Sequence, residues 1–210
     1  MSHRIDLQHI TKQIRNNIVL DDVTCSFLPG KVTGLVGVNG SGKTMLLRVV
    51  SGLCVPNKGE VFIDREKLYT DISFPKSLGL LLETPAFIDS FSGFENLNMI
   101  ASIKGKVKAE EIRDNIRKVG LDPDDPKKYR KYSLGMKQRL GIAGAIFEKP
   151  DIIILDEPTN ALDIDGVKMV KEIISEQRER DAIVVIASHD VGIIKEMADT
   201  VYTMKDGRLT

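Results

Sequence analysis

The chain has 210 residues, of which 42% are hydrophobic and 29% are charged, and this balance excludes a disordered or fibrous chain. Basic and acidic residues number 30 each, so the formal net charge is zero and we expect no nucleic-acid partner. The two cysteines, Cys25 and Cys54, do not form a metal-ligand cluster and are expected to be small buried residues.

The N-terminal sequence Met-Ser-His-Arg-Ile-Asp has no charged run followed by an apolar run, so we expect no signal peptide. No stretch of the chain approaches the roughly 20 consecutive apolar residues that a membrane-spanning helix needs. If the protein works at a membrane, we expect another polypeptide to supply the membrane-spanning part.

The first predicted elements are strands of a small antiparallel sheet. Residues from about 4 to 28 alternate between apolar and polar side chains, as in strands with one buried face. The pattern resumes at residues 55–68 with a Pro-Asn-Lys-Gly turn. We expect this sheet to lie at one side of the fold.

Four later apolar runs are short and continuous, which is typical of strands covered on both faces. They lie at residues 32–36, 78–82, 152–155 and 183–187. Between the last two runs, apolar residues recur at helical spacing over 167–178. Strands that alternate with helices predict an α/β fold with a mostly parallel core sheet.

Residues from about 85 to 147 interrupt this alternation and predict helices, the first of which begins near Ser92. There is no internal repeat and no low-complexity linker in the sequence. We therefore expect a single domain over residues 1–210, with a core of about 1–84 and 148–210 and a helical insertion of about 85–147.

One glycine-rich segment fits the phosphate-binding pattern G-x-x-x-x-G-K-[ST], between a predicted strand and a helix predicted at 45–51. Its residues are Gly37, Val38, Asn39, Gly40, Ser41, Gly42, Lys43 and Thr44, and we expect them to bind the nucleotide together with Met45. Glycines let backbone N–H groups approach phosphate oxygens. Lys43 is expected to reach the β- and γ-phosphates, and the Thr44 hydroxyl to ligate Mg²⁺. The pattern by itself indicates only a nucleoside triphosphate, since kinases, GTPases and helicases share it.

Two adjacent carboxylates, Asp156 and Glu157, follow the apolar run at 152–155. Carboxylates at the end of a buried strand are costly unless a cation such as Mg²⁺ needs them. We expect Asp156 to hold the Mg²⁺ shell and Glu157 to orient or deprotonate the attacking water. His189 ends the next predicted strand and is expected to contact the γ-phosphate.

The segment 132–143, with the sequence Tyr-Ser-Leu-Gly-Met-Lys-Gln-Arg-Leu-Gly-Ile-Ala, resembles the signature sequence of the ABC ATPases. The resemblance covers nearly the whole chain. It implies a P-loop NTPase of ABC type, with a mostly parallel core sheet, a small antiparallel sub-domain and an inserted helical sub-domain. In the terms of that family, Asp156 belongs to the Mg²⁺ shell, Glu157 is the catalytic base and His189 is the switch histidine.

The resemblance also implies that two ATPase subunits, identical or related, close head to tail around two ATP molecules. Ser133, Gly135 and Gln138 of one subunit would then contact the ATP held by the other. Asp163, in the sequence Asn-Ala-Leu-Asp, matches the loop of the family that crosses this interface.

Two positions depart from the usual pattern of the family. Ile14 falls where an aromatic residue usually stacks on adenine, so we expect it to contact the base with weaker selectivity. Glu83 falls in the coupling loop, where most members carry a glutamine that ligates Mg²⁺ and touches the membrane subunit. Glutamate keeps an oxygen ligand and adds a negative charge. The Glu-Thr-Pro-x-Phe pattern that begins at Glu83, together with the sequence Ser-Leu-Gly-Met-Lys-Gln-Arg-Leu, resembles the ATPases of bacitracin and lantibiotic exporters.

The function predicted on this basis is that of the ATP-hydrolysing motor of an ABC membrane transporter, exporting an antimicrobial peptide or other hydrophobic cargo. Its expected partners are a membrane-spanning subunit and a second ATPase subunit, at the cytoplasmic face of a bacterial cell membrane. The alternative is a soluble ABC ATPase of an assembly or maintenance machine. A catalytically silent binding module is disfavoured because Lys43, Asp156, Glu157 and His189 are all present.

Overall fold

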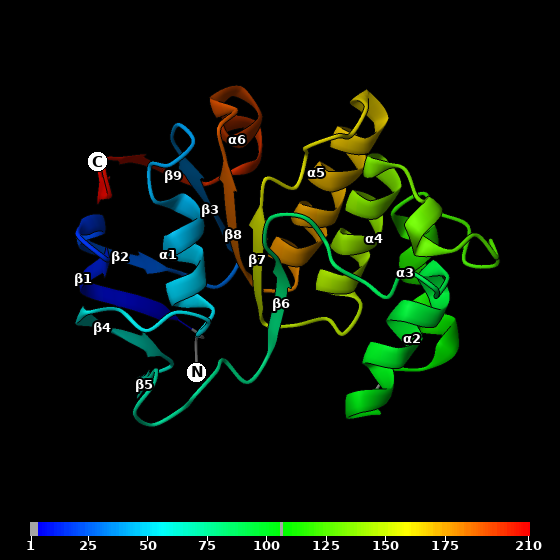
Figure 1. Cartoon of the computed structure of the whole chain (residues 1–210), viewed down its shortest axis with the longest axis horizontal. Helices are drawn as coiled ribbons and strands as arrows, with labels where there is room; N and C mark the ends of the chain where they lie inside the picture. The colour runs from blue at the N-terminus through cyan, green and yellow to red at the C-terminus, as the bar shows by residue number, and fades with distance from the viewer. Residues whose placement is uncertain (1–3, 106) are drawn as a thin grey trace.

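The computed structural model describes residues 4–105 and 107–210. The prediction of no signal peptide concerns the N-terminal segment, of which residues 1–3 lie outside the described residues. Two sheets face each other across helix α1 (Lys43–Val50), and further helices cover the opposite face of the larger sheet (Figure 1). None of the helices in the described ranges is long and apolar enough to cross a membrane.

The larger sheet has six strands in the order β10-β9-β3-β8-β7-β6. Their bounds are β3 (Lys31–Val36), β6 (Leu78–Leu81), β7 (Ile152–Asp156), β8 (Ile183–Ser188), β9 (Thr200–Lys205) and β10 (Arg208–Leu209). All neighbouring pairs are parallel except β10 with β9. Every residue of β7 and β8 is buried, which explains their continuous apolar sequences. The predicted mostly parallel core sheet is therefore confirmed, with β6 one residue shorter than predicted.

The smaller sheet is antiparallel and has four strands in the order β2-β1-β4-β5. Their bounds are β1 (Ile5–Ile14), β2 (Asn17–Phe27), β4 (Lys58–Ile63) and β5 (Glu66–Lys67). One face buries apolar residues such as Ile5, Leu7 and Phe27 in a core that also contains Leu46 and Leu47 of α1. The prediction of a small antiparallel sheet at one side is confirmed.

The remaining helices follow the predicted periodicity, with shifted ends. Their bounds are α2 (Gly93–Lys104), α3 (Ala109–Lys118), the 3₁₀ turn η1 (Tyr129–Lys131), α4 (Leu134–Ile146), α5 (Ile164–Glu179) and α6 (Val191–Met197). Residues 85–91, which precede the first predicted helix of this region, form no helix. The predicted start near Ser92 is confirmed because Ser92 and Glu95 form a capping box at the first turn of α2. Helix α1 begins two residues before the predicted start at 45.

Helices α2, α3 and α4 lie together beyond the edge of the sheet that ends with β6 (Figure 1). Helix α4 packs on β6 and β7, and its buried residues join the core that also contains α5 and α2. This arrangement brings the sequence that precedes α4 toward the carboxyl ends of the parallel strands. The division into a core and a helical insertion, with bounds near 85 and 147, stays a prediction.

Gly79 of β6 lies directly against helix α4. A Cβ atom at this position would lie 1.8 Å from the carbonyl oxygen of Ala145 and 2.7 Å from Pro150 Cγ. Because the first of these atoms belongs to backbone, the contact cannot be relieved by turning a side chain. Only glycine allows this packing.

We expect Gly79→Ala to lower the free energy of unfolding by about 2–3 kcal/mol, because the added methyl group must push α4 from β6. Urea denaturation followed by circular dichroism measures the change. Gly192→Ala is the matched control, since its Cβ atom would meet only the Asp190 carboxylate, at 3.3 Å. Equal stability of the two variants would contradict the predicted packing constraint.

Candidate nucleotide-binding site

The loop between β3 and α1 is shaped to receive phosphate. Gly40 and Gly42 have φ angles of 81° and 112°, which side chains of L residues rarely adopt. A Cβ atom at Gly42 would also lie 2.8 Å from the carbonyl oxygen of Val19. The Lys43 ammonium folds back over the loop and donates to the carbonyl oxygen of Gly37 at 2.6 Å. The free N–H groups at the start of α1 and the Lys43 ammonium together can bind an anion.

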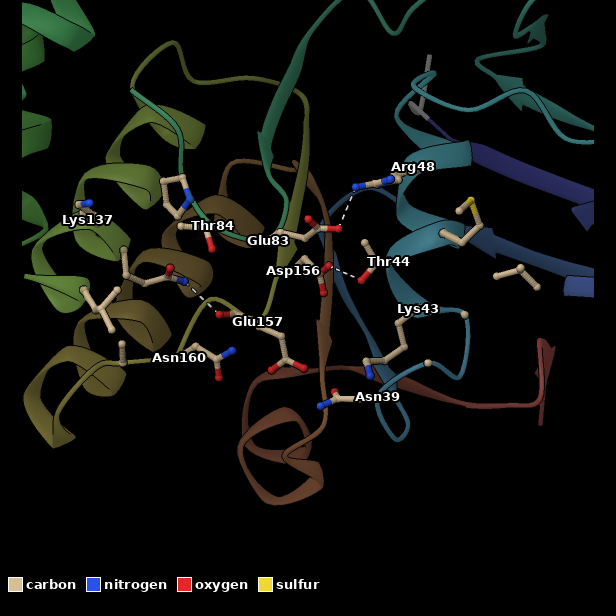
Figure 2. A pocket seen from close by; sticks show the side chains of 18 residues that line it. Asn39, Lys43, Thr44, Arg48, Glu83, Thr84, Lys137, Asp156, Glu157 and Asn160 are labelled. Carbon is tan, nitrogen blue, oxygen red and sulfur yellow. Dashed lines mark hydrogen bonds and ion pairs between the residues drawn. The ribbon is translucent and has the colours of Figure 1, made fainter. Parts of the chain in front are cut away.

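A cavity of about 540 Å³ opens beside this loop (Figure 2). Residues of the phosphate loop and of α1 that line it are Asn39, Gly40, Gly42, Lys43, Thr44, Met45 and Arg48. From other elements come Glu83, Asp156, Glu157 and Gln138 of the predicted set, together with Val19, Thr84, Pro85, Leu134, Lys137, Asn160 and Ala161. Of the other loop residues predicted to bind nucleotide, Ser41 is buried and Val38 is exposed.

Asp156 lies at the end of β7 and is 3% exposed. Its Oδ2 atom accepts a hydrogen bond from the Thr44 hydroxyl at 2.6 Å, which joins β7 to α1. Its Oδ1 atom is buried without a hydrogen-bond partner among the described residues. Burial raises the pKa of Asp156, the hydrogen bond from Thr44 opposes this, and the negative charges of Glu157 and Glu83 add to the rise.

The buried Oδ1 atom of Asp156 fits a metal ion, because an unpartnered carboxylate oxygen in a low-dielectric site favours a cation. Groups of three or more His, Cys, Asp or Glu residues able to hold a metal do not occur in the part of the chain that the structure describes. Mg²⁺ suits such a site, since it commonly takes only one or two protein carboxylates and completes its shell with water and substrate phosphates.

Glu157 follows Asp156 in the left-handed backbone region, with φ of 48°. Its backbone N–H donates to the carbonyl oxygen of Ala187 at 2.8 Å. Its carboxylate accepts hydrogen bonds from Ser188 Oγ at 2.9 Å and from the His189 backbone N–H at 3.0 Å, and His189 Nδ1 lies 3.0 Å from both oxygens. The structure therefore brings Glu157 and His189 together. Sequence reasoning missed Ser188, although a polar residue at the end of a buried strand was a signal.

Ser133 is the N-cap of α4, and its hydroxyl accepts a hydrogen bond from the Met136 backbone N–H at 3.2 Å. Neither Ser133 nor Gly135 lines the cavity of this chain, whereas Leu134 and Lys137 of the same segment do. Ser133 and Gly135 were predicted to contact ATP of a second subunit. That contact stays a prediction.

Gln138 has a different environment from the one expected for a residue facing a second subunit. Its side chain is buried, and its amide donates to the carbonyl oxygen of Glu157 of its own chain at 3.0 Å. The helical turn carries Gln138 inward from the exposed start of α4. The predicted contact of Gln138 with ATP of a second subunit stays a prediction.

Two more predicted residues lie at the margins of the site. Ile14 is the last residue of β1 and is 44% exposed, and it does not line the cavity, whereas Val19 of β2 does. Contact of Ile14 with the base stays a prediction. Asp163 is the N-cap of α5, where it accepts a hydrogen bond from Gly166, and it also pairs with Arg139 at 3.1 Å. The hydrogen bond first, and then the charge of Arg139, lower the pKa of Asp163.

Glu83 lies two residues beyond the end of β6, at the edge of the sheet where β7 ends in Asp156. Its carboxylate pairs with Arg48 of α1, with 2.8 Å between Nη2 and Oε1. Arg48 was missed by sequence reasoning. Its spacing of four residues from Thr44 was a signal, because such residues share one face of a helix.

The comparisons with known proteins agree with this geometry. Residues 20–160 match the family described as "ABC transporter", so the chain belongs to that family, as the signature segment predicted. Its relative YybJ of Bacillus subtilis, an uncharacterized ABC transporter ATP-binding protein, is 46% identical over 98% of this chain and 94% of its own length.

Two relatives carry names that bear on cargo. The bacitracin transport ATP-binding protein BcrA of Enterococcus faecalis is 35% identical over all of this chain and 68% of its own. The lantibiotic transport ATP-binding protein SrtF of Streptococcus pyogenes is 31% identical over 98% of this chain and 88% of its own. The predicted resemblance to these ATPases is confirmed.

Among solved structures, the dimeric bacterial ABC transporter cassette MJ0796 superposes with a TM-score of 0.88. The superposition covers 98% of this chain and 96% of the other, at 23% sequence identity. This similarity confirms the predicted fold class.

We expect Asp156→Asn to raise the free energy of unfolding of the metal-free and nucleotide-free protein at neutral pH. The pKa of Asp156 is higher in the folded protein than in the unfolded chain. The contribution of Asp156 to the free energy of unfolding therefore falls as the pH rises through these two pKa values. The difference in free energy of unfolding between Asp156→Asn and wild type should vanish below the ordinary carboxyl pKa of about 3.9. Urea denaturation at several pH values, with Asp114→Asn as the exposed control, measures it. A variant less stable than wild type at neutral pH would contradict this account.

Proposed function

We propose that the chain is the ATP-hydrolysing motor subunit of an ABC membrane transporter and works in a dimer of ATPase subunits. One observation carries the proposal. A single cavity is lined by the phosphate loop with Lys43 and Thr44 and by the adjacent carboxylates Asp156 and Glu157. These are the groups that phosphoryl transfer to water requires.

Each residue has a separate task in hydrolysis. Lys43 and the N–H groups of the loop bind the β- and γ-phosphates, and Thr44 and Asp156 would hold Mg²⁺, with Glu83 as a further candidate ligand. When bound, Mg²⁺ supplies positive charge against the developing charge on the phosphates. Glu157 accepts the proton of the attacking water, and His189 holds and orients the Glu157 carboxylate from the neighbouring strand.

Exposed apolar side chains support closure against a second subunit. Val38 in the phosphate loop, Leu134 beside Ser133 and Ile164 beside Asp163 are 75%, 69% and 88% exposed. Each lies in one of the three segments that the family resemblance assigns to the dimer interface. Burial of these side chains would favour the closed dimer, and the start of α4 would then face the γ-phosphate bound by the partner.

A separate membrane-spanning subunit is the second partner that we propose. An apolar cavity of about 320 Å³ lies next to the Glu83 loop, where Leu82, Pro85 and Phe87 line it together with Ile100 of α2. A segment of the membrane subunit seated there would move with the loop that enters the nucleotide cavity. The chain would accordingly sit on the cytoplasmic face of the cell membrane.

The names of BcrA and SrtF support peptide antibiotics as the cargo class of this transporter. The alternative of a soluble ATPase in an assembly or maintenance machine has no observation in its favour, because the relatives described above are named for transport.

Affinity purification of the tagged chain from its native cell in mild detergent tests the transport role. We expect a protein with several membrane-spanning helices to co-purify. Recovery of soluble proteins alone, under conditions that preserve other transporter complexes, would overturn the transport role and leave the ATPase assignment in place.

We expect Glu157→Gln to lower the ATP hydrolysis rate by about 100-fold or more, because the proton acceptor is lost. The same variant should retain bound ATP and shift to a dimer. Phosphate release and light scattering after size-exclusion chromatography measure these two effects. Glu172→Gln, an exposed glutamate of α5, is the control. Hydrolysis by Glu157→Gln at the wild-type rate would refute the assignment of the base.

A further inference from the structure

Arg48 and Glu83 form an ion pair inside the nucleotide cavity that none of the roles above requires. Both residues line the cavity, and the pair joins α1 to the loop after β6 (Figure 2). Arg48 lies four residues after Thr44, so both side chains leave the same face of α1. One helix therefore presents Thr44 to Asp156 and Arg48 to Glu83.

The charges of the cavity balance only because Arg48 is present. Its charged lining residues are Lys43, Arg48 and Lys137 against Glu83, Asp156 and Glu157. Glu83 lines the same cavity as Thr44 and Asp156, so its negative charge faces the place where the phosphates and the metal ion are proposed to bind. An unpaired Glu83 would therefore repel a triphosphate that approaches Thr44 and Asp156.

The ion pair between Arg48 and Glu83 can also break. The Arg48 and Glu83 side chains are 41% and 59% exposed, and ion pairs with that exposure contribute little to stability. The loop itself is held nearby by a second contact, because the Tyr129 hydroxyl donates to the carbonyl oxygen of Pro85 at 2.5 Å. Glu83 can therefore turn from Arg48 toward a cation while its loop stays in the cavity.

We infer that Arg48 is a positioning residue for metal-bound nucleotide. Its guanidinium neutralises Glu83 and holds that carboxylate beside α1, so that Glu83 does not repel the phosphates before a metal ion arrives. Arg48 thereby sets how strongly nucleotide binding depends on Mg²⁺. This inference rests on the proposed function, because it concerns the same nucleotide cavity.

A purely structural role for Arg48 makes a different prediction. Arg48 lies in the last turn of α1, where a positive charge is favourable at the helix C-terminus. If that were its whole role, loss of the charge would lower the melting temperature and leave the Mg²⁺ dependence of nucleotide binding unchanged.

The experiment measures the dissociation constant of β,γ-imido ATP by calorimetry, once with Mg²⁺ and once with EDTA, and compares the ratio of the two values. The variants are Arg48→Met, Glu83→Gln, the double variant and Arg48→Lys. Arg117→Met is the matched control, since Arg117 forms ion pairs of comparable exposure on α3. The melting temperature of each variant reports whether the fold is retained.

We expect Arg48→Met to raise the ratio of the EDTA value to the Mg²⁺ value by about threefold to fivefold, the range that a partly exposed ion pair can supply. Glu83→Gln should lower the ratio, because it leaves Arg48 free to attract phosphate without metal. The double variant and Arg48→Lys should both return to the wild-type ratio.

An Arg48→Met ratio equal to that of Arg117→Met would overturn the inference, as would a double variant that keeps the raised ratio. Failure of the wild-type chain to bind nucleotide at all would overturn the proposed function, and with it this inference. Binding by wild type with one common ratio in every variant would leave the proposed function standing and reject only the role of Arg48.

Discussion

The hydrogen bond between Asp156 and Thr44 joins two parts of the chain that are 112 residues apart, and the nucleotide site is built around it. It places a buried carboxylate at the first turn of the helix that follows the phosphate loop. Burial disfavours the ionised carboxylate, and one hydroxyl donor satisfies only one of its two oxygens. The remaining oxygen makes a cation favourable at this point of the cavity. This unpartnered oxygen is the reason that we propose a metal-bound nucleotide as the ligand.

The parallel sheet makes this arrangement possible. Strands β3, β8 and β7 lie side by side and run in the same direction, so the phosphate loop, His189 and the Asp-Glu pair emerge at one edge. Glu157 occupies a left-handed backbone conformation there, which costs energy for a residue with a side chain. The Ala187 carbonyl and the Gln138 amide hold this peptide in place from two sides. Helix α4 is therefore linked to Glu157, the proposed base, of its own chain as well as to the proposed interface.

The charged side chains of the cavity are held by contacts within the protein. Lys43 contacts a loop carbonyl, Glu157 is held by His189 and Glu83 is held by Arg48. The pair of Arg48 and Glu83 is partly exposed, whereas Lys43 is buried and the Glu157 side chain is 18% exposed. The three contacts hold Lys43, Glu157 and Glu83 in place around the cavity. Such prearranged groups reduce the reorganisation that the reaction requires.

The sequence by itself determined the parallel core, the antiparallel sheet, the phosphate loop, the Asp-Glu pair and the helix start at Ser92. These features depend on spacing within a few residues, where strand or helix periodicity, glycine conformation and capping act directly. Only the tertiary structure decided the pairing of Arg48 with Glu83 and the inward direction of Gln138. It also decided that Val19 rather than Ile14 lines the cavity. Each of these outcomes depends on how distant elements cross, which local sequence patterns do not encode.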